Sequence, residues 1–75
     1  MAEPLPILPP LLLTAEQVAQ ALGVSLRHIR ALDASGRIPR GIRLSRSKRW
    51  NTAELSRWCD AGAPPRDAWE AMKRE

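Results

Sequence analysis

Two helix boundaries separated by a single residue constrain the fold of this 75-residue chain more than any other feature. Thr14 and Gln17 have the spacing of a capping box, in which each side chain satisfies a backbone N–H group at the start of a helix. Gly23 is expected to end that helix, because glycine adopts the left-handed conformation without a steric penalty. Ser25 is a candidate N-cap for the next helix, so only Val24 lies between the two signals. Helices joined by so short a link must cross at a steep angle.

The spacing of apolar residues supports both helices. The second helix is expected to run from about Leu26 to Ala34, because Gly36 closes it and Pro39 prevents it from resuming. Each helix then has one apolar face. The residues expected to face inward are Val18, Ala19 and Leu22 in the first helix, and Ile29 and Leu32 in the second. The pair has the geometry of a helix-turn-helix.

A period of two replaces the helical period after residue 41. We expect a hairpin of two short strands whose connecting turn, at residues 45–48, carries positive charge. Its side chains are expected to alternate, with Ile42, Leu44 and Trp50 on one side and Arg43 and Arg49 on the other.

Two further helices are expected after the hairpin. The first begins at residue 51 or 52, where Asn51 and Glu54 have the spacing of a second capping box. The last is expected from about Arg66 to Lys73, behind two prolines that suit its first turn. The residues expected on one face are Leu55, Trp58 and Cys59 in the first of these helices, and Ala68, Trp69 and Met72 in the second.

These elements predict a mostly α fold, a small winged helix-turn-helix with three to four helices and a two-stranded β wing. We expect a Pro-rich N-terminal arm at residues 1–11, the winged helix-turn-helix domain at residues 12–61, and a C-terminal helical extension at residues 62–75. No stretch approaches the roughly 20 apolar residues of a membrane span, and no signal peptide is expected. The single cysteine, Cys59, has no internal partner for a disulfide, which favours a reducing cytoplasm.

Positive charge is concentrated in the middle third of the sequence. The chain has a formal net charge of +4, but residues 25–50 carry eight basic residues and a single acid, Asp33. Residues 1–24 contain no Lys or Arg, and residues 51–75 are nearly balanced. Such confinement is typical of a domain that neutralises nucleic-acid phosphates with one face. The alternative is a solvated surface without a ligand, although such a surface normally interleaves both signs.

The second helix is the candidate for reading base edges in DNA, because a major groove about 12 Å wide accepts one α-helix. Its candidate contacts are Ser25, Arg27, His28 and Arg30. Arginine can bridge the O6 and N7 acceptors of guanine with two parallel hydrogen bonds. Ser25 has a competing role as an N-cap, and His28 can contact a base or a phosphate, or be solvated only.

The hairpin and its flanks supply a second set of candidate DNA contacts. Arg46 is the best candidate for entry into a minor groove, because a narrow groove concentrates negative potential. Arg37 and Arg40 flank the loop before the hairpin and are expected to touch phosphates or nothing. The full set is Arg37, Arg40, Arg43, Arg46, Ser47, Lys48 and Arg49. The sequence has no catalytic constellation, so neither enzymatic activity nor a cofactor or metal is expected.

The three tryptophans divide into two groups. Trp50 and Trp58 are expected in the core, because one ends a strand and the other lies on the apolar face of a helix. The sequence allows two interpretations of Trp69. Together with Met72 it either packs on the domain or forms an exposed stripe that a protein partner covers.

From Leu12 to Trp58, about 47 of the 75 residues, the sequence resembles the MerR-like winged helix-turn-helix domains, and in particular the small excisionase and AlpA-type branch. The first motif is Leu12-Leu13-Thr14-x-x-Gln17-Val18-Ala19-x-x-Leu22-Gly23-Val24-Ser25. The later motifs are Gly36-Arg37-Ile38-Pro39 and, after the basic wing, Trp50-x-x-x-Glu54-Leu55-x-x-Trp58. The long dimerisation helix and effector domain of MerR proteins have no counterpart here, so no small-molecule effector is expected.

The resemblance implies a double-stranded DNA-binding protein in the cytoplasm, associated with the bacterial nucleoid. It implies an excisionase, or recombination directionality factor, that bends attachment-site DNA and steers an integrase toward excision of a mobile element. Copies of such proteins assemble head to tail on DNA. An AlpA-type transcriptional regulator and a protein-binding adaptor are the alternatives. Carried over by position, the family contacts fall on Ser25, Arg27, His28 and Arg30 in the helix, and on Arg46, Lys48 and Arg49 in the wing.

Overall fold

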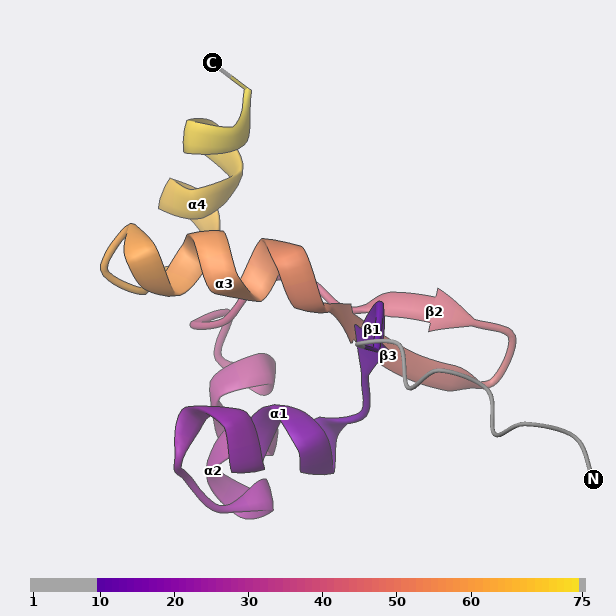
Figure 1. The fold of residues 1–75 in the computed structure, drawn as a ribbon. Coiled ribbons are helices and arrows are strands. Elements are labelled where there is room, and N and C mark those ends of the chain that lie inside the picture. The colour runs from indigo at the N-terminus through magenta and orange to yellow at the C-terminus, as the bar shows by residue number, and fades with distance from the viewer. Residues whose placement is uncertain (1–9, 75) are drawn as a thin grey trace, which may run out of the picture.

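The computed structural model describes residues 10–74, which form four short helices and a small antiparallel sheet (Figure 1). In chain order the elements are β1 (Leu12–Leu13), α1 (Ala15–Leu22), α2 (Leu26–Ala34), β2 (Ile42–Leu44), β3 (Ser47–Asn51), α3 (Thr52–Asp60) and α4 (Arg66–Lys73). This architecture confirms the predicted winged helix-turn-helix. The prediction of an arm at residues 1–11 falls mostly on residues 1–9, which lie outside the described residues.

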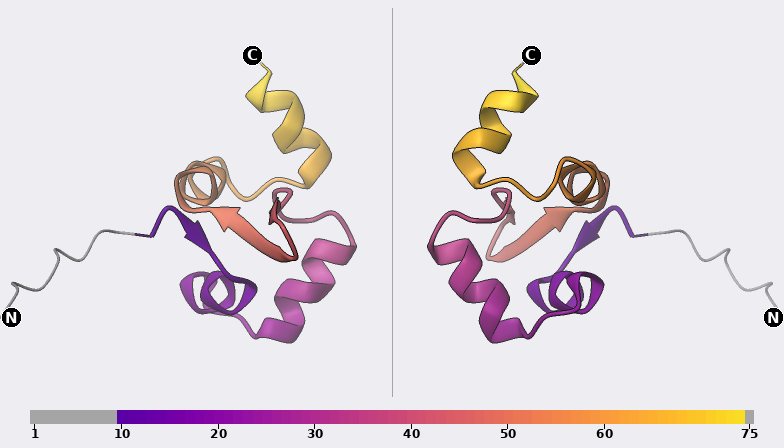
Figure 2. Two further views of the ribbon diagram at one scale, coloured as in Figure 1. Left: turned by 90° about the vertical axis from the view of Figure 1, so that its right-hand side faces the viewer. Right: turned by 90° about the vertical axis from the view of Figure 1, so that its left-hand side faces the viewer.

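The helix-turn-helix forms where the sequence predicts it. The Thr14 hydroxyl accepts the Gln17 backbone N–H at 3.1 Å, and the Gln17 side chain accepts the Thr14 N–H at 2.9 Å, which completes the capping box. Gly23 ends α1 in the left-handed conformation, with φ of 73°. The Ser25 hydroxyl then caps α2. Figure 2 shows α1 almost end-on while α2 runs across the view, so the two helices cross steeply.

The sheet has a third strand that the sequence analysis did not predict. Its order is β1-β3-β2, with both pairs antiparallel. The two residues of β1 pair with the last two of β3, so Leu13 lies opposite Trp50. Thr52 extends this contact, because its backbone N–H donates to the Leu11 carbonyl at 3.0 Å. A strand of two residues has no period of its own, and its partner is distant in the sequence, so no local pattern identifies it.

The faces of the hairpin differ from the prediction. In register, Ile42 pairs with Arg49 and Leu44 pairs with Ser47, so each pair lies on one face of the sheet. Trp50 follows Arg49 in β3 and therefore lies on the opposite face from Ile42 and Leu44. The prediction that these three share a face was wrong, because the two-residue turn exchanges odd and even positions between the strands. Ile42 and Leu44 are 39% and 50% exposed, outside the core.

The core lies between the helices and the inner face of the sheet. It consists of Val18, Ala19, Ile29, Ile38, Trp50, Leu55, Trp58 and Trp69. Each tryptophan pairs its indole N–H, as buried indoles usually do. Trp50 donates to the Pro39 carbonyl at 3.0 Å, and Trp58 donates to the Pro64 carbonyl at 2.8 Å. The core positions predicted for Trp50 and Trp58 are confirmed.

In the last two helices, one open alternative is decided and three details differ from the prediction. Trp69 is 5% exposed and belongs to the core, so the packed alternative holds and a partner cannot reach it. Met72 on the same helix is 47% exposed. Cys59 is exposed rather than on the apolar face of α3. The Asn51 side chain accepts the Glu54 backbone N–H and so caps α3. The Glu54 carboxylate, however, accepts a hydrogen bond from Trp69 of α4, so the second capping box is only half formed.

Candidate nucleic-acid interface

The second helix of the helix-turn-helix presents its polar residues to solvent. Ile29 is fully buried and fixes one side of α2 against the core. Arg27, His28 and Arg30 are exposed on the rest of its surface. Arg27 and Arg30 are three residues apart, so they are neighbours on the helix. The Ser25 hydroxyl accepts the His28 backbone N–H at 3.0 Å, which confirms its role as N-cap.

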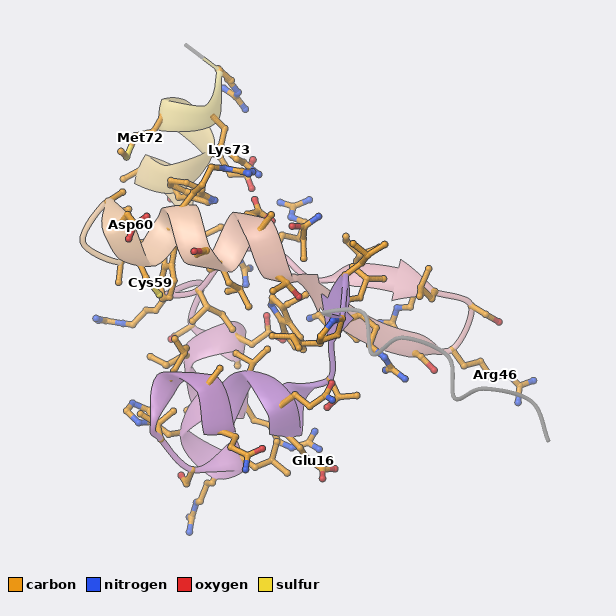
Figure 3. The ribbon with its side chains drawn as sticks, in the orientation of Figure 1. Glu16, Arg46, Cys59, Asp60, Met72 and Lys73 are labelled. Carbon is orange, nitrogen blue, oxygen red and sulfur yellow. The ribbon has the colours of Figure 1, made fainter. Side chains whose placement is uncertain are left out.

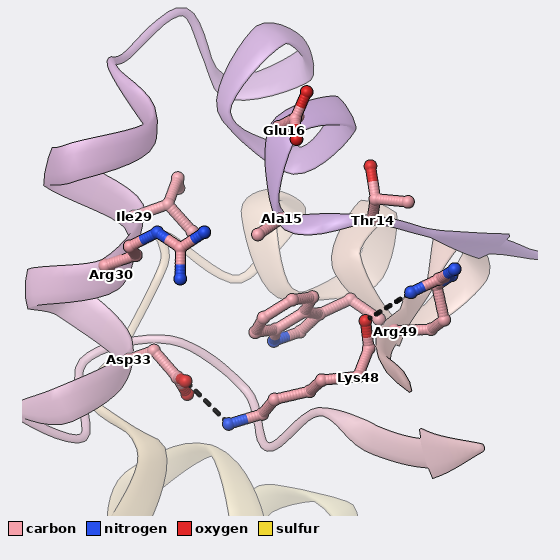
Figure 4. Close-up of a pocket in the computed structure, with 9 residues that line it drawn as sticks. Thr14, Ala15, Glu16, Ile29, Arg30, Asp33, Lys48 and Arg49 are labelled. Atoms are coloured by element: carbon pink, nitrogen blue, oxygen red, sulfur yellow. Dashed lines mark hydrogen bonds and ion pairs between the residues drawn. The ribbon is translucent and has the colours of Figure 1, made fainter. Parts of the chain in front are cut away.

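A groove of about 310 Å³ lies between the start of α1, the side of α2 and the end of β3 (Figure 4). It brings together two arginines that are distant in the sequence, Arg30 from α2 and Arg49 from β3. The remaining residues of its lining are Thr14, Ala15, Glu16, Ile29, Asp33, Lys48 and Trp50. The groove therefore places cations of the helix and of the wing along one concave surface.

The wing (β2, β3 and their turn) projects away from the helices (Figure 1). Arg43 and Arg46 are exposed, and Figure 3 shows Arg46 pointing outward from the end of the hairpin. Ser45 in the turn has φ of 56°, a left-handed conformation that glycine tolerates better. The turn consists of only two residues, Ser45 and Arg46, between the paired strands.

The loop from α2 to the wing holds two further arginines at the surface. Ile38 and Pro39 are buried and fix the loop to the core. Arg37 and Arg40 flank this buried pair, and both are exposed. The positions of these two arginines are thus set by their neighbours, although their side chains are in solvent.

Three other wing residues predicted to bind DNA are partly enclosed. Ser47 and Arg49 are half-buried, and the Arg49 guanidinium donates through Nη1 to the Lys48 carbonyl at 3.0 Å. The Lys48 side chain makes stronger contacts within the domain. Its ammonium lies 2.6 Å from the Asp33 carboxylate and 5.4 Å from the centroid of the Trp50 ring. Lys48 is the wing cation that forms an ion pair within the described chain.

Asp33 and Arg66 are functional candidates that the sequence analysis missed. Arg66 at the start of α4 donates to the Asp33 carboxylate at 2.9 Å and, through Nε, to the Ile38 carbonyl at 2.9 Å. Its backbone N–H also donates to the Gly36 carbonyl at 3.0 Å. Asp33 stands out in the sequence as the single acid of residues 25–50, but Arg66 is 33 residues away, and no local signal joins the two.

A second polar cluster joins α3 to α4. Burial of the Glu54 carboxyl by itself would raise its pKa, but hydrogen bonds from Lys73 and Trp69, with the charges of Lys73 and Arg57, lower the pKa below its ordinary value. The same hydrogen bond to Glu54 raises the pKa of Lys73. The Trp69 indole donates to Glu54 at 3.1 Å. These contacts hold α4 against α3, away from the wing tip.

Residues 10–74 show neither a metal-binding cluster nor a membrane-spanning helix. They contain no group of three or more His, Cys, Asp or Glu side chains arranged to hold a metal ion. Within the same range, each helix is too short or too polar to span a lipid bilayer.

Comparison with known proteins places this arrangement in a family. The helix-turn-helix domain family matches residues 12–62, from β1 through the end of α3. This match covers more than half of the chain and includes α2 and the wing, whereas α4 lies outside it. Searches of curated proteins and of solved structures found no match. On the strength of the family match and of the capped, steeply crossed α1 and α2, the chain belongs to the helix-turn-helix domain family.

Proposed function

We propose that this chain is a sequence-specific double-stranded DNA-binding protein whose contact surface consists of α2 and the wing. Membership of the helix-turn-helix family implies DNA binding. The observation that carries the proposed surface is its unbalanced charge. Of the eight basic residues in residues 25–50, Lys48 alone has an ion-pair partner in the described chain. Cations without an acidic partner can neutralise DNA phosphates and release counterions, which gives affinity for any sequence.

The proposed base contacts come from α2. Arg27 and Arg30 are exposed neighbours, and each can form two hydrogen bonds to one guanine in the major groove. His28 lies between them in the sequence and contacts a base or a phosphate. The Ser25 oxygen already accepts the His28 N–H, but its hydroxyl hydrogen is free to donate to a phosphate oxygen. We therefore assign sequence reading mainly to the two arginines.

The proposed wing contacts position the protein on DNA. Arg46 at the tip of the turn enters a minor groove, where a narrow A·T-rich stretch attracts arginine. The other proposed contacts bind phosphates, which carry no sequence information but fix register. They are Arg37, Arg40, Arg43, Ser47 and Arg49. Lys48 differs from this group because its charge is already paired with Asp33.

We further propose that the protein acts as a recombination directionality factor. In this role it bends attachment-site DNA and steers an integrase toward excision of a mobile element. The resemblance of residues 12–58 to small excisionases supports the role. The size of the domain is consistent with it, because one small module binds weakly and adjacent copies raise occupancy without new base contacts. The partners are then duplex DNA, an integrase and further copies of the chain, assembled head to tail.

An AlpA-type transcriptional regulator is the second candidate, because the same motifs resemble that branch. The two roles differ in the arrangement of their sites. Head-to-tail copies require direct repeats in the DNA, whereas a two-fold dimer requires a palindrome. A protein-binding adaptor, the third candidate, requires no salt-sensitive affinity for DNA.

Selection of binding sites from random duplexes, followed by footprinting on the selected DNA, tests these roles. Evenly spaced protection in one direction, added stepwise as protein concentration rises, supports the directionality factor. One symmetric footprint supports the regulator. The absence of enrichment and of a salt-dependent shift rejects DNA binding and leaves the adaptor.

A further inference from the structure

One carboxylate connects three elements that the proposed DNA-binding surface needs in fixed positions. Asp33 lies in the last turn of α2, and its Oδ2 accepts from Lys48 of β3 at 2.6 Å. Its Oδ1 accepts from Arg66 of α4 at 2.9 Å. Arg66 also donates to the Ile38 carbonyl in the loop that leads to the wing. Helix α2, the wing and α4 therefore meet at the Asp33 side chain.

The path of the Lys48 side chain explains how this contact is reached. Figure 4 shows the Lys48 side chain reaching from β3 toward α2, where its ammonium meets the Asp33 carboxylate. Its ammonium lies 5.4 Å from the Trp50 ring centroid, close enough for a cation–π contact. Gly41 provides the room, because a Cβ atom there would lie 2.6 Å from Lys48 Cε and 2.9 Å from Cγ. Lys48 is thus held by Asp33 and Trp50 over a glycine that leaves it space.

We propose that Asp33 is a positioning residue of the DNA-binding surface, which holds the wing against α2 and keeps Lys48 from binding a phosphate. This inference rests on the proposed DNA-binding function. The Lys48 side chain is 38% exposed, and the Asp33 side chain, which is 20% exposed, is also paired with Arg66. Loss of the Asp33 charge is expected to change DNA affinity and selectivity beyond any change in folding. Through Arg66, α4 becomes part of the binding unit although it lies outside the family match.

The salt dependence of DNA affinity tests this role with the full chain. Asp33→Asn keeps the shape of the side chain but removes its charge, which frees Lys48 to bind a phosphate. We expect stronger binding to a random duplex and weaker discrimination in favour of the selected site. The slope of log Kobs against log salt should become steeper by about one unit, because each phosphate contact contributes about 0.9. Asp33→Glu, which restores the carboxylate, should return the slope toward the wild-type value.

Asp60→Asn is the matched control for charge. It changes the net charge by the same amount, but Asp60 is exposed at the end of α3 and makes no ion pair in the described chain (Figure 3). Its slope should equal that of the wild type. If Asp33→Asn and Asp60→Asn change DNA binding equally, the effect is one of net charge and the role of Asp33 is rejected.

Two further variants keep the test decisive if Asp33→Asn folds poorly. Gly41→Ala displaces Lys48 without a change of charge and should steepen the slope in the same way. Lys48→Met should leave the wild-type slope unchanged, because the lost charge was already neutralised. A slope that is shallower by about one unit in Lys48→Met shows a phosphate bound to Lys48 and overturns the proposal.

Failure of the inference and failure of the proposed function give different results. A wild-type chain without salt-dependent binding rejects the DNA-binding function and the role of Asp33 with it. A wild-type chain that binds DNA, with an Asp33→Asn variant that loses affinity only in proportion to its unfolded fraction, rejects the role of Asp33 alone. Thermal unfolding of each variant supplies that fraction.

Discussion

The two halves of the chain use their charges differently. In residues 25–50, the arginines are unpaired in the described structure and most are exposed, and Lys48 is the basic residue that finds an acid. In residues 51–74, acids are interspersed with the bases, and Lys73 pairs with Glu54 and Glu70 while Arg66 pairs with Asp33. Cations that pair with acids join one helix or strand to another. Cations without them remain at the surface, where a polyanion can replace the missing partners.

Helices α3 and α4 support the basic segment through the core. Trp58 and Trp69 belong to the same core as Val18 and Ile29 of the helix-turn-helix. The C-terminal half therefore stabilises the surface that the basic half presents. Changes at the core tryptophans of the C-terminal half should alter stability, and changes at the exposed arginines of residues 25–50 should alter DNA binding alone.

The largest expected effect follows from removal of a supporting tryptophan. Trp58 is 4% exposed, and Trp58→Ala would leave a cavity and an unpaired Pro64 carbonyl. We expect the free energy of unfolding to fall by about 3–5 kcal/mol, measured by urea denaturation. Cys59→Ala is the control, because Cys59 is adjacent in the sequence but exposed. Equal urea midpoints for the two variants would show that Trp58 does not support the core.

A smaller effect, confined to DNA binding, is expected at the exposed arginines. Arg30→Ala should reduce discrimination between the selected site and random DNA by about 1–3 kcal/mol, the value of a good bidentate base contact. Arg57→Ala removes the same charge from the exposed surface of α3 and should leave discrimination unchanged. Competition binding at fixed salt measures both. If Arg30→Ala weakens binding to both DNAs equally, Arg30 contacts the backbone rather than a base.

The elements that the sequence predicts well are those fixed by neighbours in the chain. The Thr14–Gln17 capping box and the Ser25 cap each join residues three apart, so they can be recognised locally. The last helix also has the predicted bounds, Arg66–Lys73. Strand β1 and the faces of the hairpin were missed, because both depend on pairing between separate strands. A local pattern does not contain that pairing.

Local sequence patterns predict the candidate site only in part, for the same reason. Sequence analysis identifies the basic residues of the α2 and wing segment, because charge is visible residue by residue. It does not distinguish Lys48 from its neighbours, because the distinction comes from Asp33, 15 residues away. Glu54 is a similar case. Its spacing from Asn51 suits a capping box, but its carboxylate instead accepts hydrogen bonds from Trp69 and Lys73 of α4.

The turn of the wing should respond to relief of backbone strain. Ser45 has φ of 56°, and Ser45→Gly should stabilise the hairpin by up to roughly 1 kcal/mol, because the relieved strain of about 1–2 kcal/mol is partly offset by the greater entropy of glycine in the unfolded chain. Ser56 is exposed in the middle of α3, and Ser56→Gly should instead lower the free energy of unfolding by roughly 0.5 kcal/mol. Urea denaturation of both variants gives the sign. A destabilised Ser45→Gly variant would mean that the serine side chain contributes more than the strain costs.

The smallest effect is a pH dependence in the C-terminal half. Burial alone would raise the pKa of Glu54, but hydrogen bonds from Lys73 and Trp69, together with the charges of Lys73 and Arg57, hold the folded pKa below the unfolded value of 4.5. The folded state therefore binds fewer protons at this group than the unfolded state. The contribution is present above about pH 4.5 and is lost as pH falls through the folded pKa. The pKa of Lys73 is raised in the folded chain, so its pH dependence has the opposite sign. Its contribution to stability is present below about pH 10.5 and is lost as pH rises through the folded pKa.

Glu54→Gln should remove the acid-sensitive contribution. Its free energy of unfolding should be lower than that of the wild type near neutral pH, and the difference should shrink below about pH 4.5 as the wild-type carboxylate becomes protonated. Asp60→Asn controls for the loss of one carboxylate, because Asp60 is exposed. A difference that stays constant across this range would mean that Glu54 acts through shape rather than charge. In that case the contrast between a half with paired charges and a half with unpaired ones would not extend to the α3–α4 contact.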